Sequence, residues 1–148
     1  MDAFRRFGPH SLALMMSAGS DRRRTLFIVL GLFVGTVLLF SRTWSYGFLN
    51  YDDNDYVTAN PRVTTGLTAE NVRWAFSTGA VSYWHPLTWI SHQADWTRFG
   101  ADARGHHVVA TLWHALNAVL AFLACRRLTG ALWLSAIAAA LFAWHPLR

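Results

Sequence analysis

Three apolar runs separated by polar stretches organise the chain. The first, TLFIVLGLFVGTVLLFS, carries no charge over residues 25–41, and as a helix it would cover roughly 26 Å. Arg42 can reach the polar side of a membrane surface, so the pattern predicts a transmembrane helix over residues 25–42. No pair of small residues at the spacing of a signal-peptidase site follows, which favours an uncleaved anchor over a signal peptide.

The second apolar run predicts a transmembrane helix over residues 106–125. At helical spacing its polar and small positions fall on one stripe, which we expect to face protein because unpaired polar groups are costly in hydrocarbon. His114 has two interpretations, an interhelical hydrogen bond and a functional role, and the first is favoured. The stripe consists of His107, Ala110, His114, Asn117 and Ala121.

The third apolar run predicts a transmembrane helix over residues 131–147, joined to the second by a short turn at residues 126–130. Ser135, Ala139 and Ala143 recur at i, i+4 spacing, and such small side chains let helices approach closely. The second and third helices should therefore form an antiparallel hairpin.

The polar segment between the first two runs, residues 43–105, is too long for a simple connection. LTAENVRWAFST predicts a short helix that starts near Thr68 with Glu70 in its first turn. HPLTWISHQADWTRFG predicts a second helix with Pro86 at its first position and Gly100 at its end. Both are amphipathic, so they could lie on the membrane surface or cap the helix bundle, and periodicity does not separate these alternatives.

Composition and charge agree with a membrane protein. Hydrophobic residues make up 53% of the 148 residues and charged ones only 14%, an unusual mixture for a soluble domain. The net charge is +5, but the arginines flank the apolar runs instead of forming one basic face, which argues against nucleic-acid binding. Residues 22–24 and 126–127 are arginines, which places them in the cytoplasm and the 43–105 loop outside it.

Two smaller expectations follow. Residues 1–24 should form a loosely ordered cytoplasmic tail, because Gly8, Pro9 and a Ser/Gly pair near residues 19–20 interrupt them. Cys125 is the single cysteine, which excludes an intrachain disulfide and a metal site built on paired cysteines.

The stretch YDDNDY places Asp52, Asp53 and Asp55 just beyond the first apolar run. An EF-hand loop is excluded because no Gly stands at the turn. Asp53 and Asp55 would face the same side of an extended segment and could share a divalent cation. A carboxylate at the edge of an apolar wall could instead act as a general base, and a solvated turn or helix cap explains the acids equally well.

Three stretches together resemble a known family: FLNYDDNDYVTANPRVTTGLTAENVRWAF, YWHPLTWISHQADWTRFGADARGHHVVATLWHALNA and RRLTGALWLSAIAAALFAWHPLR. They resemble the amino-terminal part of bacterial tetratricopeptide-repeat membrane proteins. These are similar in turn to the eukaryotic transmembrane and tetratricopeptide-repeat O-mannosyltransferases, which belong to the C-type membrane glycosyltransferases. The resemblance covers roughly residues 45–148.

The resemblance implies an all-α integral membrane protein of a bacterial inner membrane, with three transmembrane helices and two interfacial helices in the outer loop. It implies transfer of a sugar from a polyprenyl phosphate to a hydroxyl, often of a protein Ser or Thr, usually with inversion. Asp52 would take the proton of the acceptor hydroxyl, and Asp53 would orient the acceptor or help to bind a divalent cation. His85 is a candidate for binding substrate.

The family continues through further membrane helices and tetratricopeptide repeats, and no 34-residue repeat is detectable here. We therefore expect an amino-terminal fragment that does not catalyse alone. Two alternatives stay open: a non-enzymatic membrane scaffold, and a membrane-surface metal binder that uses Asp53 and Asp55 with nearby histidines.

Overall fold

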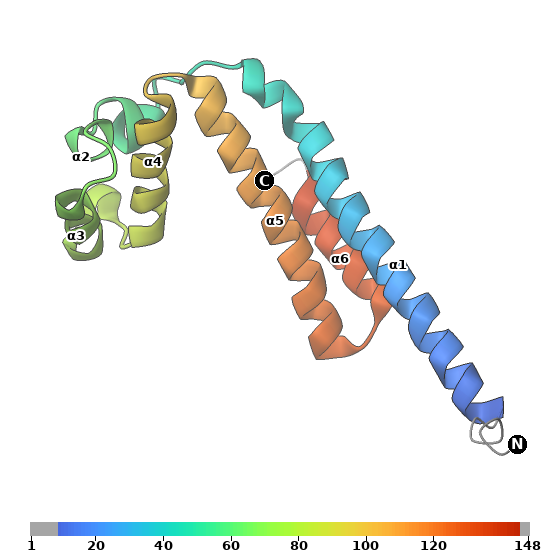
Figure 1. The fold of residues 1–148 in the computed structure, drawn as a ribbon. Helices are drawn as coiled ribbons and strands as arrows, with labels where there is room; N and C mark the ends of the chain where they lie inside the picture. The colour runs from blue at the N-terminus through green and yellow to red at the C-terminus, as the bar shows by residue number, and fades with distance from the viewer. Residues whose placement is uncertain (1–8, 146–148) are drawn as a thin grey trace, which may run out of the picture. The chain divides into compact units, whose positions relative to one another are not determined.

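The computed structural model describes residues 9–145, with side chains from Ser20 onward, and all regular structure in this part is helical. The all-α expectation is confirmed. Six α-helices carry the fold (Figure 1). They are α1 (Pro9–Phe40), α2 (Pro61–Thr64), α3 (Ala69–Ser77), α4 (Pro86–Phe99), α5 (Ala103–Thr129) and α6 (Leu132–Trp144). Shorter turns are the 3₁₀ segments Ser41–Ser45 and Ala80–Ser82 and the π-helical turn Asn54–Thr58.

The chain divides into two compact units. One unit, the bundle unit, consists of Met1–Leu39 and His114–Arg148, and the other, the loop unit, is Phe40–Trp113. α1 starts at Pro9, inside the stretch expected to be a loose tail, and Pro suits the first position of a helix because its missing N–H has no partner there.

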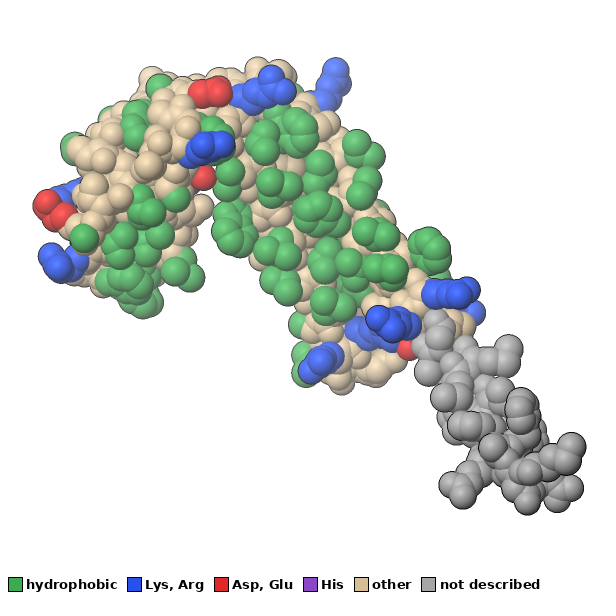
Figure 2. All heavy atoms as spheres, in the orientation of Figure 1, with side chains coloured by type: hydrophobic (Ala, Val, Ile, Leu, Met, Phe, Trp, Pro, Cys, Tyr) green, Lys and Arg blue, Asp and Glu red, His purple; other side chains and the backbone are tan. Residues whose placement is uncertain are grey.

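In the bundle unit, α1, α6 and the second part of α5 lie side by side (Figure 1). Leu32, Val119, Phe122 and Ala139 form the buried core between them. The outer surface is also apolar, and Figure 2 shows hydrophobic side chains across the visible face of these helices. A helix that is apolar on its exposed side as well as its packed side is typical of a membrane environment.

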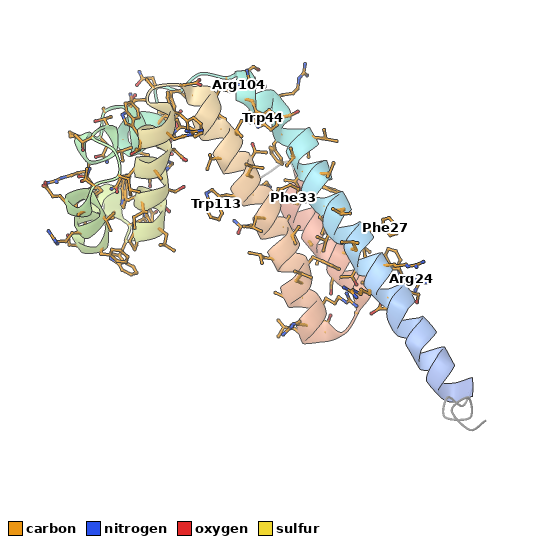
Figure 3. All side chains as sticks on the ribbon, viewed as in Figure 1. Arg24, Phe27, Phe33, Trp44, Arg104 and Trp113 are labelled. Carbon is orange, nitrogen blue, oxygen red and sulfur yellow. The ribbon has the colours of Figure 1, made fainter. Side chains whose placement is uncertain are left out.

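The outward and inward faces of α1 are both aromatic. Phe27 is 74% exposed and projects away from the bundle, whereas Phe33 packs against the core cluster (Figure 3). Two helices, Ser20–Ser45 and Ala103–Thr129, are long and apolar enough to cross a membrane. α6 has 13 residues and spans about 20 Å, less than the ~30 Å hydrocarbon core of a bilayer. Length therefore supports two of the three expected spans.

Polar contacts fix α6 within the bundle unit. His114 Nε2 donates to the carbonyl of Ala143 at 2.9 Å, so the interhelical hydrogen bond expected of this histidine is confirmed. Trp144 Nε1 donates to Thr36 Oγ1 at 3.0 Å, across from Gly35. The small residues Ser135, Ala139 and Ala143 are buried, as their spacing predicts.

The prediction that the polar stripe of the second apolar run faces protein is wrong for two of its positions. Ala110 and Asn117 are exposed, and the buried positions of α5 lie on a neighbouring face. Apolar packing decides the orientation, because turning the Phe122 ring into the core removes far more surface from solvent than turning Asn117 inward would. Beyond Gly105 and His106 in its first turn, the buried positions of α5 are Thr111, Ala115, Ala118, Val119 and Phe122.

The loop unit has its own core, made by Val57, Val63, Ala75 and Trp89. Its helix ends follow the local signals in the sequence. The Thr68 side chain accepts from Asn71 N and caps α3, and Pro86 occupies the first turn of α4. Gly100 ends α4 at a φ of +55°, a conformation that glycine adopts without steric cost. Both predicted helices of the loop are thus confirmed as helices.

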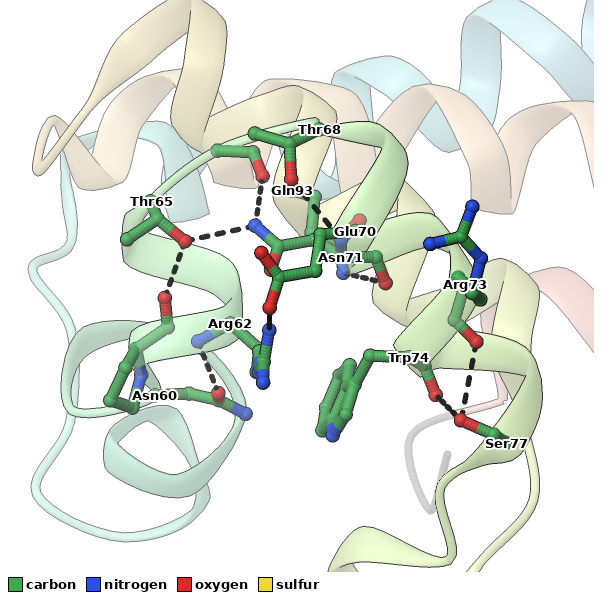
Figure 4. Close-up of polar contacts among 12 residues, drawn as sticks. Asn60, Arg62, Thr65, Thr68, Glu70, Asn71, Arg73, Trp74, Ser77 and Gln93 are labelled. Atoms are coloured by element: carbon green, nitrogen blue, oxygen red, sulfur yellow. Dashed lines mark hydrogen bonds and ion pairs between the residues drawn. The ribbon is translucent and has the colours of Figure 1, made fainter.

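A buried asparagine joins three elements of the loop unit. Asn71 Nδ2 donates to Thr65 Oγ1 at 2.9 Å and to the Gly66 carbonyl at 2.7 Å (Figure 4). Its backbone carbonyl accepts from the buried Gln93 Nε2 at 3.2 Å. This network ties the turn after α2 to α3 and α4 without using charged groups.

Replacement of Asn71 by Ala should destabilise the loop unit by about 1–3 kcal/mol, because it leaves a buried carbonyl without its donor. The urea dependence of protease cleavage within residues 40–113, in detergent micelles, measures this change. Arg73→Ala is the control, since Arg73 is exposed on the same helix, and its effect should stay within about 0.5 kcal/mol. Equal effects of the two replacements would contradict the structural role of Asn71.

Candidate functional site

The acidic stretch forms a short helical turn at the start of the loop unit. Asp52 is exposed and Asp53 is half-buried. Asp53 Oδ2 accepts a hydrogen bond from the backbone N–H of Leu49 at 2.7 Å. Asn54 bonds to the side chains of Asn50 and, at 2.9 Å, Thr58. Short-range hydrogen bonds therefore hold the Asp53 carboxylate in place and leave Asp52 open to solvent.

The extended backbone expected for Asp53 and Asp55 is wrong. Asp53 has αR dihedral angles and Asp55 lies in the π-helical turn Asn54–Thr58. Residues two apart on a helix do not face the same side, so the geometric basis for a shared cation between these two acids is absent. Local side-chain bonds from Asn50 and Asn54 stabilise the turn over the extended form.

The acidic turn packs on α4 through one aromatic side chain. The Tyr56 ring stacks on the rings of Trp89 and His85, with centroids 5.2 and 5.7 Å apart, and meets His92 edge-on at 6.3 Å. Trp89 is fully buried and also contacts Trp74 edge-on at 5.2 Å. Tyr56 thus joins the acidic turn to α4 and to the two histidines at positions 85 and 92.

Three ionisable side chains converge where α4 ends and α5 begins. His92 and Asp95 are separated by three positions on α4, so they share a face. His106 lies in the first turn of α5. One ligand atom from each of these residues lies within 4.8 Å of the others. Among the described residues, this is the group of histidine and acidic side chains whose geometry suits a metal ion.

Burial shifts the protonation of this group. Burial lowers the pKa of His92, and the neighbouring His106 and His85 lower it further. The negative charge of Asp53 raises the same pKa. Burial raises the pKa of Asp95, and His106 partly offsets this effect. Burial therefore favours the neutral form of His92, and the negative charge of Asp53 acts against this effect.

The orientation of His106 is fixed from several sides. Its Nε2 lies 3.0 Å from the carbonyl of Gly100, and the rings of Phe48, Trp96 and Phe99 surround it. A Cβ atom at Gly105 would lie 2.3 Å from the Phe99 ring, so the α4–α5 turn allows no side chain there. Tight packing of this turn sets where His106 points.

The structure brings some predicted site residues together and adds others. Asp53 and His85 both act electrostatically on His92, whereas Asp52 and Asp55 are exposed. His85 is half-buried before α4, and its Nε2 has no hydrogen-bond partner among the described residues. Sequence reasoning missed His92, Asp95 and His106 as a group. The H-x-x-D spacing on an amphipathic helix was the available signal, but nothing in the sequence linked it to position 106.

A hollow of about 530 Å³ lies in the bundle unit, lined by Asp21, Arg22, Thr25, Leu26, Val29 and Arg126. The Arg126 guanidinium donates to Thr25 Oγ1 and to the Asp21 carboxylate. The Asp21 carboxylate balances the charge of Arg126, and this ion pair joins α5 to α1.

Comparison with known proteins shows a distant, partial similarity. The chain is 30% identical over 119 residues to Protein O-mannosyl-transferase Tmtc2 of Drosophila melanogaster, a match that covers 75% of this chain. It spans 13% of the length of that fly protein. No protein-family model matches the chain, and no solved structure does.

Trp89 offers a test of the packing that supports the site. Trp89→Ala should destabilise the loop unit by about 3–5 kcal/mol, since it removes the ring on which Tyr56 stacks and which His85 contacts. Trp89→Phe keeps an aromatic ring and removes an indole N–H that has no partner among the described residues, so its cost should be clearly smaller. Urea-dependent proteolysis of residues 40–113 compares the two variants, and equal losses would contradict this stacking arrangement.

Proposed function

Given this similarity to an O-mannosyl-transferase, we propose that the chain is the amino-terminal part of a membrane glycosyltransferase. The complete enzyme transfers a sugar from a polyprenyl phosphate to a hydroxyl acceptor, a protein Ser or Thr. The observation that carries the proposal is the similarity over 75% of this chain. The Asp53 carboxylate, held by the Leu49 N–H and near enough for its charge to act on His92, supports the site.

The proposed chemistry uses the two adjacent acids differently. The exposed Asp52 carboxylate accepts the proton of the acceptor hydroxyl, whose oxygen attacks the anomeric carbon of the sugar. The bond from that carbon to the phosphate oxygen breaks, the polyprenyl phosphate leaves, and the configuration inverts. Asp53 orients the acceptor, and His85 binds substrate from the start of α4. General-base catalysis of this kind typically contributes about 10²–10⁴ in rate.

The proposed membrane arrangement follows the arginines. Arg22–Arg24 and Arg126–Arg127 lie on the cytoplasmic side of a bacterial inner membrane, and the 43–105 loop lies on the opposite side. The exposed apolar side chains of α1 and α5 contact lipid. Pro86–Phe99 and Ala69–Ser77 then lie at the outer surface, where a lipid-linked sugar and a protein acceptor can meet.

A non-enzymatic scaffold is the alternative. The observation that favours it is that the side chains of Asp53 and Asn54 are already used in local hydrogen bonds of the turn. In a scaffold the bundle unit anchors the chain, the loop unit assembles partners, and the acids of the turn serve only its local hydrogen bonds.

Asp52→Asn should lower sugar transfer at least ~10²-fold, and Asp53→Asn should lower it less, because Asn retains an acceptor oxygen for Leu49 N–H. Transfer of labelled mannose from polyprenyl phosphate to a Ser/Thr peptide is measured in membranes expressing the complete reading frame of the gene. Asp102→Asn is the matched control, since Asp102 accepts from Arg104 N at the start of α5 and Asn can do the same. Unchanged transfer in Asp52→Asn removes this acid from the mechanism, and absence of transfer by the unmodified protein favours the scaffold.

The orientation has its own test. In a Cys125→Ala background, Ala101→Cys should react with a membrane-impermeant maleimide on intact spheroplasts, because position 101 is exposed in the loop unit. Leu128→Cys, whose native side chain is 86% exposed, should react only after permeabilisation. The opposite labelling pattern would place the loop unit in the cytoplasm.

A further inference from the structure

We propose that His92, Asp95 and His106 bind one divalent metal ion of the zinc class. This site is separate from the Asp53–Asp55 pair considered from the sequence, and it does not depend on sugar transfer. Two imidazole nitrogens and one carboxylate oxygen are ligands that zinc and related divalent metals accept.

The distances allow closure around an ion. The three ligand atoms lie within 4.8 Å of one another, whereas atoms bound to one tetrahedral zinc at ~2.0–2.1 Å are roughly 3.3 Å apart. Side-chain rotations that move each ligand atom by about an ångström would close this gap. His92 and Asp95 come from successive turns of α4 and His106 from α5, so the ion would cross-link these two helices beside their connecting turn.

The tautomer of His106 is set for metal binding. A carbonyl oxygen only accepts, so the contact with Gly100 makes Nε2 the donor and leaves the Nδ1 lone pair available. This backbone contact is the kind of second interaction that orients metal-ligating histidines. Nδ1 is buried without a hydrogen-bond partner among the described residues, and His106 is only 6% exposed.

Neither of the other two side chains forms an ion pair within the described part of the chain. His92 Nδ1 is likewise buried without a hydrogen-bond partner. Asp95 is 9% exposed, and within the described part of the chain no hydrogen bond or ion pair joins it to either histidine. A buried carboxylate without a cation is costly. The three groups are too far apart to satisfy one another directly but close enough to share an ion.

The ligand set also favours an incompletely filled coordination sphere. Three protein ligands leave a fourth position of a tetrahedral ion for water or another ligand. Asp53 lies near enough to His92 for its charge to act there, so negative charge from the acidic turn adds to the attraction for a cation.

Cobalt(II) titration of the full chain in detergent micelles tests the proposal. Wild-type protein should bind one equivalent with the intense visible absorption of a four-coordinate ion, and zinc should displace it. His92→Gln, Asp95→Asn and His106→Gln should each weaken binding at least ~100-fold, since loss of even a second-shell partner commonly costs 10–100-fold. His107→Gln is the matched control, because His107 neighbours His106 outside the three-residue group, and its affinity should change less than about threefold.

A second measurement separates ligand loss from misfolding. Zinc should raise the urea midpoint for proteolysis of residues 40–113 in wild type and His107→Gln, because an ion that binds the folded form stabilises it. The isosteric Asp95→Asn should fold without zinc and gain no such protection. Absorption typical of hydrated cobalt, or equal binding by wild type and Asp95→Asn, would mean an adventitious ion only and would overturn the proposal.

Discussion

The burial of Trp89 in the loop unit is the interaction on which the rest of the site depends. Its ring lies fully buried between Tyr56 and Trp74, and these contacts join the acidic turn, α3 and α4. A segment between membrane helices gains stability of its own only if it buries enough apolar surface to offset the entropy of ordering it. Aromatic rings supply that surface in few residues.

Around this apolar centre the loop unit also buries several polar side chains. Asn71 and Gln93 bond to backbone carbonyls and tie helices together. The histidines near the α4–α5 turn are different, because buried nitrogens of His92 and His106 have no hydrogen-bond partner among the described residues and lie beside the Asp95 carboxylate. Buried polar groups of that kind cost stability, so they are where binding or chemistry is expected.

The sequence anticipated those features that depend on local signals. Thr68, Pro86 and Gly100 mark helix ends through side-chain capping, a fixed φ and a positive φ, which neighbouring residues determine. It misplaced features that depend on packing. Asn117 was expected inside and is exposed, because Phe122 and Ala118 take the inner face. The shared cation considered for Asp53 and Asp55 assumed an extended segment, whereas these residues lie in a helical turn.

The sequence alone thus predicted the apolar runs, the role of the arginines and the helix ends. Hydrophobicity, charge and capping act between near neighbours or between a segment and its solvent. The acidic turn was also visible as a candidate site. Only the tertiary structure brought His106 to His92 and Asp95, because the turn after Phe99, closed by Gly100 and by packing of Phe99 on Gly105, sets where α5 starts. Contacts between residues that are distant along the chain depend on packing, which no short pattern records.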